Sequence, residues 1–392
     1  MLLFVTVLTI CIISRSEADF FIPCIPVLQK HFGLSPFEVQ LSLSLNFIGY
    51  CLGGLIAGFL GDKFNYRMII ISSLAIFAAA TLLCALAGNY GLVLFGRFVQ
   101  GLTIAGPTVL SYVILIETSK FRDQLTRLGL INGSITLIMT MAPTIGSYLG
   151  MYTSWRFNFL AVFVMALVAW SLSYKVVEAS NKVTDKITVF LPFKEYFTLV
   201  QSRKLMIFTG ALCFIIAPYW VFISMSPIYY VNDLGVPLIE YMWYKNILAI
   251  IFGIISLMNG LIVDKFGCKN CFLFSIVMCF ISIICQFIIV LTGIDEPKII
   301  TAAMAILTVG TAFLINFLYA NALTAITNHM GKASVVIHSV RLIFTSVSLS
   351  IVSKLYYGNF FVIGIALIIM MLTGLLITLY LYSLGYLKGI AR

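Results

Sequence analysis

Three charged residues lie close together in the first apolar stretch of the chain. Arg15, Glu17 and Asp19 occupy alternate positions there. A charged side chain at the middle of a bilayer costs about 2.5–3.5 kcal/mol on insertion scales, so each needs a reason to remain. Arg15 and Asp19 are four residues apart and can pair on one helix face, whereas Glu17 projects roughly the other way. Two interpretations stay open: a neutral internal pair beside one acid, or an acid that binds and releases a proton.

A second base occurs in a later apolar stretch of the same half. Arg97 is followed by Gln100, about one helical turn further on. An opposite charge nearby favours the charged form of a carboxyl group, and burial disfavours it. Arg97 is therefore the natural partner for an acid of the first stretch. A conformational change that altered burial or distance would couple movement to proton uptake or release.

The other half of the chain carries its own polar pair. His338 and Arg341 are three residues apart and lie near one face of a predicted helix. One interpretation is an ion pair with an acid elsewhere, or an arginine that extends to the interface. The other is a contact to an anion or to substrate. An arginine at such a place is unfavourable for a purely cationic ligand.

Composition places these residues in a membrane. The chain has 392 residues, of which 61% are hydrophobic and 10% charged, against about 45–50% and about 25% in soluble domains. This excludes a cytosolic enzyme, a disordered protein and a secreted disulfide scaffold. The net charge of +10 comes from bases scattered singly between apolar runs, which indicates anionic lipid headgroups rather than nucleic acid. Most cysteines lie inside apolar runs, and we expect no metal and no cofactor.

Breaks at charged and Gly/Pro/Asn clusters divide the chain into spans of the length that a bilayer requires. The sequence predicts an all-α membrane protein with twelve transmembrane helices in two pseudo-symmetric six-helix bundles. The predicted spans are 2–27, 37–61, 66–87, 90–117, 124–149, 155–177, 204–231, 238–263, 269–293, 298–326, 332–357 and 359–385. The predicted domains are an N-terminal bundle at 1–177, a central cytoplasmic loop at 178–203 and a C-terminal bundle at 204–392.

The two halves share a motif. Gly58–Phe64 reads GFLGDKF, and Gly260–Phe266 reads GLIVDKF in the matching turn of the second half. Parallel six-helix repeats are a transporter architecture. Most Lys and Arg residues fall in one set of loops, so we expect both termini on the cytoplasmic side. The candidate gating residues of this repeated motif are Gly58, Asp62, Lys63, Arg67, Asp264 and Lys265.

The motif, its repeat and the twelve spans resemble the major facilitator superfamily. The family pattern has glycine where this chain has Asn65, and we expect Asn65 to tolerate the left-handed backbone that glycine supplies. Three stretches narrow the resemblance: Asp19–Pro26 is similar to the opening of Bcr/CflA-type drug-resistance transporters, Arg97–Gly101 to a helix 4 motif, and Ala142–Gly146 to the antiporter motif. Pro143 and Gly146 are expected to bend helix 5 and allow its close approach to the opposite bundle.

The resemblance implies proton-driven export of small amphipathic drugs or metabolites by alternating access. It makes Asp19 the first choice for the proton site, Glu17 the second, and Arg97 the base that tunes them. The implied location is the bacterial inner membrane, as a multi-pass monomer whose partners are a small-molecule substrate, protons and lipid, with no nucleic acid. The candidate substrate-cavity residues are Arg15, Gln100, Tyr219, Trp220, Asn316, His338 and Arg341.

Other functions stay open from the sequence. One is a proton-coupled or facilitated importer of a small anionic metabolite, with Arg341 binding its acid group. Another is a channel or a non-transporting membrane receptor, which the paired loop motif disfavours because a channel needs no rocking halves. An enzyme is not expected, since the sequence offers no nucleophile–base pair, metal cluster or phosphate-binding loop.

Overall fold

The chain forms two compact units, Met1–Pro192 and Phe193–Arg392, in a computed structural model. The structure describes residues 2–61, 64–117, 138, 141–150, 153–177, 197–324 and 330–387. Within these ranges, 10 helices are long and apolar enough to cross a membrane. The chain is an all-α, multi-pass membrane protein, as predicted.

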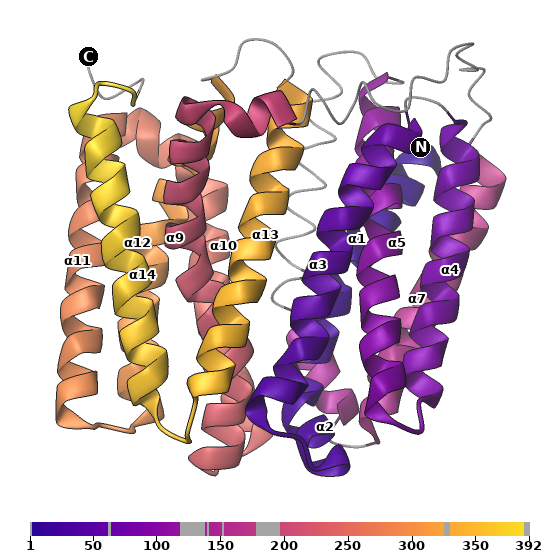
Figure 1. Cartoon of the computed structure of the whole chain (residues 1–392), viewed down its shortest axis with the longest axis horizontal. Helices are drawn as coiled ribbons and strands as arrows, with labels where there is room; N and C mark the ends of the chain where they lie inside the picture. Colours follow the sequence, from indigo (N-terminus) through magenta and orange to yellow (C-terminus); the bar gives the residue numbers. More distant parts are fainter. Residues whose placement is uncertain are drawn as a thin grey trace. The chain divides into compact units, whose positions relative to one another are not determined.

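The first unit is built from helices that run alongside one another (Figure 1). Its long helices are α3 (Pro36–Gly61), α4 (Tyr66–Leu86), α5 (Tyr90–Glu117) and α7 (Trp155–Val176). Residues 141–150 are also helical. They are the described part of the predicted span 124–149, of which the rest lies almost wholly outside the described residues.

The first predicted span is broken rather than continuous. Helix α1 (Leu2–Phe21) gives way to a 3₁₀ turn, η1 (Ile22–Cys24), before α2 (Ile25–Phe32). Proline supplies no backbone N–H and crowds the preceding turn, and the chain has Pro23 in η1 and Pro26 in α2. The break therefore falls directly after the stretch that contains the clustered charges. The three charges of α1 also explain why it is not among the ten helices that are apolar enough to cross a membrane.

Glycines set the distance between α3 and α5. A Cβ at Gly53 would lie 2.0 Å from the carbonyl oxygen of Leu102, and a Cβ at Gly101 would lie 2.0 Å from that of Asn46. No side chain fits at such separations, so the two backbones are in direct contact. Small residues serve the same purpose at helix interfaces throughout membrane proteins. This contact determines which side chains of α3 reach α5.

Asn65 has a different role from the one expected. Its φ of −61° and ψ of 123° are extended rather than left-handed, and its Oδ1 accepts a hydrogen bond from the backbone N–H of Arg67. Asn65 is thus the N-cap of α4, a position that asparagine favours because its side chain satisfies an unpaired amide. Arg67 donates to the carbonyl of Tyr174 at 2.8 Å. Asp62 and Lys63 lie outside the described residues.

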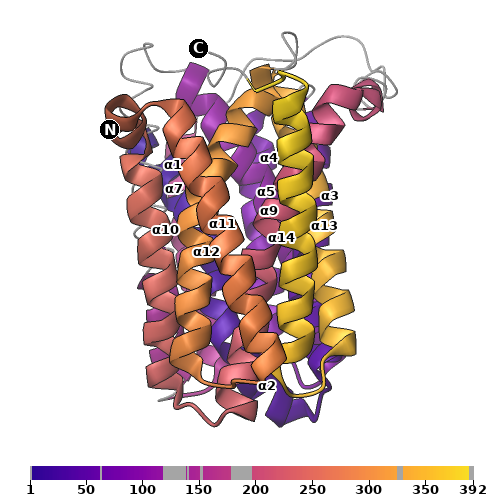
Figure 2. The same ribbon diagram turned by 90° about the vertical axis from the view of Figure 1, so that its left-hand side faces the viewer.

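The second unit repeats the arrangement of long helices. Its elements are α9 (Arg203–Pro227), the π-helical turn η2 (Ile228–Asp233), α10 (Leu238–Phe266), α11 (Cys268–Thr292), α12 (Pro297–Thr324), α13 (Met330–Leu355) and α14 (Phe360–Ser383). Helices α11, α12 and α14 run side by side (Figure 2).

Hydrogen bonds from two tyrosines join separate segments at one end of this unit. Tyr229 in η2 donates to Asp295 Oδ1 at 2.6 Å, just before α12. Tyr356, which follows α13, donates to Asp233 Oδ2 at 2.5 Å. Burial, and then the hydrogen bond to Asp233, raise the pKa of Tyr356 well above its ordinary value, so the phenol remains a donor. These bonds join three segments that are distant in sequence.

We expect Tyr356→Phe to lower the free energy of unfolding by about 1 kcal/mol, because the carboxylate of Asp233 loses a donor while the ring keeps its packing. The measurement is unfolding of detergent-purified protein followed by intrinsic fluorescence. Tyr357→Phe is the matched control, since Tyr357 is 61% exposed. Equal stability of the two variants would show that the bond contributes nothing.

Candidate functional site

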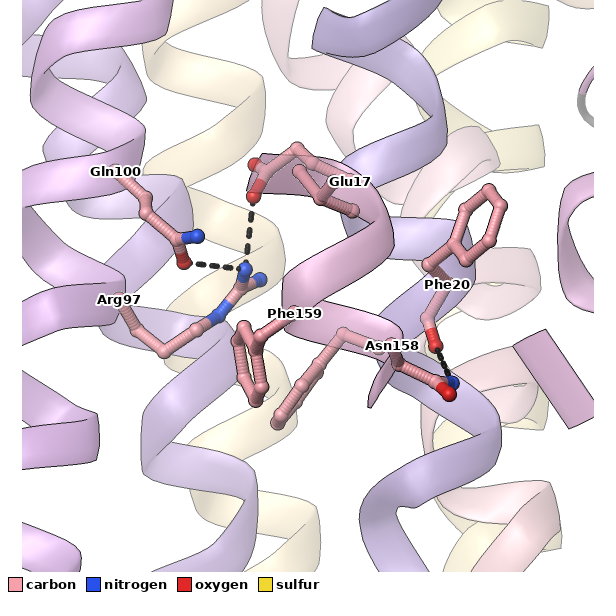
Figure 3. A pocket seen from close by; sticks show the side chains of 8 residues that line it. Glu17, Phe20, Arg97, Gln100, Asn158 and Phe159 are labelled. Carbon is pink, nitrogen blue, oxygen red and sulfur yellow. Dashed lines mark hydrogen bonds and ion pairs between the residues drawn. The ribbon is translucent and has the colours of Figure 1, made fainter. Parts of the chain in front are cut away.

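A buried ion pair joins α1 to α5 in the first unit. Arg97 Nη1 lies 2.8 Å from Glu17 Oε2, and the two side chains are 1% and 3% exposed (Figure 3). Removing two charges from water is costly, and the cost is offset only when the geometry is good and further hydrogen bonds are made. The surroundings of the pair supply such bonds.

Gln100 extends the pair toward α4. Its Oε1 accepts a hydrogen bond from Arg97 Nη1 at 2.9 Å, and its Nε2 donates to Thr81 Oγ1 at 2.8 Å. The Thr81 hydroxyl in turn donates to the carbonyl of Phe77 at 2.7 Å. The amide is therefore held with its oxygen toward the arginine. A fixed amide of this kind orients the guanidinium for one acid.

Asn46 of α3 contacts both members of the pair. Its Nδ2 donates to the backbone carbonyl of Arg97 at 3.1 Å and lies 3.5 Å from Glu17 Oε2. The glycine contact between α3 and α5 is what brings this amide so close. On another side, the guanidinium carbon of Arg97 lies 4.5 Å from the centre of the Phe21 ring, an attractive cation–π geometry.

The arginine still has unused donors. Arg97 Nε and Nη2 are buried and have no hydrogen-bond partner among the described residues. A small cavity beside them is lined by Glu17, Phe21, Gln100 and Phe159 among others, and the centre of a water molecule can occupy about 10 Å³ of it. That is the space of about one water molecule. The site can thus hold a water between unsatisfied donors and a carboxylate.

Asn158 of α7 donates hydrogen bonds beside the break between α1 and α2. Its Nδ2 donates to the carbonyls of Phe20 at 2.8 Å and Gly146 at 2.7 Å (Figure 3 draws the first). A Cβ at Gly146 would lie 2.9 Å from the Phe20 oxygen and 3.0 Å from its Cα. The structure thus shows a close approach of Gly146 to α1 of its own unit, and the expected approach of helix 5 to the opposite bundle stays a prediction. The neighbouring Pro143 is buried.

The other charges of α1 are placed differently from Glu17. Asp19, the first choice from the sequence, is buried at 5% exposure, whereas Arg15 is exposed. The acid that meets Arg97 is Glu17. The pairing arises because α1 turns Glu17 toward α5. Which of the two acids binds the proton stays a prediction.

In the second unit, the structure brings His338 and Arg341 into contact on α13. Arg341 Nη2 lies 2.8 Å from His338 Nδ1. Because a guanidinium only donates, this nitrogen accepts, and the imidazole carries its proton on Nε2. Both side chains are half-buried. Arg341 is therefore a cation that lies beside an uncharged histidine.

The remaining cavity candidates are spread over α9 and α12. Tyr219 and Trp220 are half-buried and meet edge to face with centroids 6.1 Å apart, and Tyr219 stacks on Phe252 of α10 at 5.9 Å. Asn316 is exposed and donates to the carbonyl of Ala312. The two rings of the aromatic pair are nearly perpendicular, and the Asn316 amide bonds its own helix.

The gating candidates within the described residues lie at helix ends. Gly58 is in the last turn of α3, and Asp264 and Lys265 are exposed at the end of α10. Lys265 Nζ lies 5.4 Å from the centre of the Phe266 ring. In the second unit these residues stand at the turn between α10 and α11.

Sequence reasoning missed three residues of the site. Asn46, Thr81 and Asn158 all contact a predicted site residue or the helix break beside it. The available signal was a polar side chain inside an apolar span, where polar groups need partners. Many other hydroxyls share that signal and simply bond their own helix, as Thr108 does.

The chain matches the profile of the Major Facilitator Superfamily over residues 7–349, and it belongs to this family of membrane transporters. It is 26% identical over 290 residues to a Haemophilus influenzae protein titled bicyclomycin resistance protein homolog, covering 71% of each chain. It is 25% identical to the chloramphenicol resistance protein CraA of Acinetobacter baumannii, over 57% of this chain and 54% of that protein. These relatives confirm the resemblance to drug-resistance transporters.

Solved structures show the same fold. The nucleoside transporter NupG has a TM-score of 0.75 at 12% identity, covering 97% of this chain and 99% of the other. The D-xylose-proton symporter has a TM-score of 0.71 at 15% identity, covering 99% and 97%. At these identities the likeness concerns the fold, and the predicted major facilitator architecture is confirmed.

Removing either member of the ion pair should leave a buried charge without its partner. We expect Glu17→Gln and Arg97→Gln each to lower the free energy of unfolding by about 3–5 kcal/mol. The double variant should lose about 2 kcal/mol less than the sum, because neither charge remains. Denaturant unfolding of purified protein in detergent measures all three variants.

Arg156 provides the matched control for this cycle. It donates to the carbonyl of Ala87 at 3.1 Å. Glu17→Gln combined with Arg156→Gln should therefore be additive within experimental error. Additivity in both cycles would show that Glu17 and Arg97 do not stabilise each other.

Proposed function

We propose that this transporter is a proton-coupled exporter of small amphipathic molecules. The observation that supports it best is the buried pair of Glu17 and Arg97, supported by Gln100 and Asn46. Relatives titled for resistance to bicyclomycin, chloramphenicol and multiple drugs support the direction and the class of cargo.

Glu17 is the proposed proton site. A proton that adds to its Oε2 neutralises the carboxylate and removes the charge that holds the guanidinium of Arg97. Arg97 then keeps Gln100 Oε1 as its remaining acceptor at 2.9 Å. Protonation thus converts one buried ion pair into a lone buried cation, a state that favours rearrangement around α1 and α5.

The break in helix 1 is the proposed hinge for that rearrangement. It begins five residues after Glu17 and is held by the amide of Asn158. Transporter sites commonly use such discontinuous helices. A change in the charge of Glu17 would therefore act close to the irregular backbone of η1. Asp19, buried on the same helix, is the second candidate acid.

The topology and location form part of the same proposal. Both termini would be cytoplasmic in a bacterial inner membrane, with residues 178–203 linking a bundle at 1–177 to one at 204–392, and the two bundles would alternate access as a monomer. The repeated turn containing Gly58 and Asp264 would gate the cytoplasmic side, together with Asp62.

The test of coupling is proton release from detergent-purified protein when chloramphenicol, or another drug shown to bind, is added in weak buffer. We expect release from the parent protein and little or none from Glu17→Gln, because the variant has no titratable group at that position. Glu296→Gln is the control, since Glu296 is an exposed acid outside the predicted spans. It should release protons like the parent.

Asp19→Asn separates the two candidate acids. If it abolishes release while Glu17→Gln does not, the proton site is Asp19. If both variants release protons like the parent, the coupling site lies elsewhere and proton antiport loses its support in this unit. Substrate binding is measured in parallel, so that loss of release is distinguished from loss of binding.

A second candidate function is import of a small anionic metabolite. The contact between Arg341 and a neutral His338 favours it, because it offers a half-buried cation that can bind a carboxylate. Counterflow in proteoliposomes with organic anions distinguishes this candidate. Saturable anion uptake that is lost in Arg341→Gln, with no drug transport, would favour import over export.

The orientation has its own test. We expect Glu296→Cys to react with a membrane-impermeant maleimide added outside intact cells, and Lys269→Cys to react only after permeabilisation. Both native side chains are exposed in the structure. The parent protein, with its native cysteines, is the control for background labelling. The reverse pattern would invert the proposed topology.

A further inference from the structure

A large apolar groove lies within the second unit. Its cavity volume is about 430 Å³, and its walls come from α10, α11 and α12. The lining residues are Ile255, Asn259, Ile262, Phe266, Asn270, Cys271, Phe274, Ser275, Val309 and Phe313. This volume is in the range of small-molecule sites, yet its walls are almost wholly hydrocarbon.

Part of the groove wall is at the molecular surface. Phe266 is 56% exposed and Phe274 is 51% exposed. In a membrane, these faces meet lipid chains rather than water. Hydrocarbon inside the groove would contact α10, α11 and α12 together, and would fill a space in which the surrounding side chains otherwise lack partner atoms.

Basic side chains stand at one end of the groove. Lys265 closes α10 and Lys269 is in the first turn of α11, and both are exposed. They flank Phe266 and Asn270, which line the groove. A turn with Gly267 at a φ of +79° joins the two helices. Two cations therefore lie next to an apolar cavity, as a lipid with an anionic headgroup requires.

A polar group occurs at an intermediate depth. Asn259 lines the groove, and its Oδ1 has no hydrogen-bond partner among the described residues. It is six residues before Lys265 on α10, which corresponds to about 9 Å along a helix. Rotation of the amide would direct its N–H donors to an ester carbonyl of a lipid. From the end of α10 inward, the lysines, the amide and the hydrocarbon walls follow the order of phosphate, ester and acyl chain in a phospholipid.

We propose that this groove binds one anionic phospholipid, with an acyl chain in the cavity and the phosphate near Lys265 and Lys269. The lipid would come from the leaflet at that end of α10. A zwitterionic lipid offers the same chain but no net negative charge, so it should bind more weakly. The proposal does not depend on what the protein transports or in which direction.

The test uses native mass spectrometry of delipidated full-length protein titrated with phosphatidylglycerol or with phosphatidylcholine of identical chains. We expect one tightly retained phosphatidylglycerol. The variant Lys265→Gln/Lys269→Gln should bind it about 25-fold more weakly, roughly fivefold for each lysine. The control is Lys298→Gln/Lys354→Gln, which removes two other exposed lysines and should change the affinity less than threefold.

A second pair of variants tests the chain site. Val309→Trp should fill the groove and abolish retention, whereas Leu291→Trp, at a residue of α11 that is 68% exposed and outside the groove, should not. A phosphatidylglycerol with a photoreactive acyl chain should crosslink to peptides containing Phe274 or Val309.

Three outcomes would overturn the proposal. One is equal retention of the two lipids by the parent. Another is equal loss in both double lysine variants. The third is crosslinking spread evenly over all helices. Binding of a fluorescent amphipathic drug in the groove, without competition from phosphatidylglycerol, would also overturn it by identifying another occupant.

Discussion

The arrangement of the first unit depends on one electrostatic constraint: a carboxylate and a guanidinium buried together where water is scarce. Glu17 and Arg97 are almost fully buried, and two ions in such a place are tolerated only when nearby groups replace their hydration. Gln100 and Asn46 supply part of that replacement. The requirement explains why three separate helices contribute polar side chains to one point in an otherwise apolar unit.

Backbone contacts make this cluster possible. Glycines bring α3 against α5, so that the short side chain of Asn46 reaches the carbonyl of Arg97. Gly146 permits an equally close approach to Phe20, next to the break in helix 1. The same residues that shape the interfaces therefore place the ion pair beside an irregular backbone segment. The proposed proton site and the proposed hinge therefore share one location in the first unit.

The second unit differs from the first in the placement of its polar groups. At one end of it, tyrosines bond to Asp233 and Asp295, and the pair of His338 and Arg341 lies within α13. Its long helices are otherwise largely hydrocarbon, and the groove between α10, α11 and α12 is lined in the same way. The two units thus share a fold while differing in where charge is buried. This difference is consistent with ion coupling in the first unit and with contacts to hydrophobic ligands or lipid in the second.

The sequence alone determined the membrane class, the family and most of the helix positions that the structure describes, because these follow from apolar length, charge placement and the repeated turn motif. It also gave Arg97 as the partner of an acid in helix 1. Only the tertiary structure decided which acid, since the rotation of α1 relative to α5 turns Glu17 toward Arg97. Likewise, Asn46 and Asn158 gain their roles from close backbone approaches at glycines, where an added Cβ would lie only 2.0–2.9 Å from a carbonyl oxygen. Such distances depend on packing between segments far apart in the chain, which spacing along the sequence does not encode.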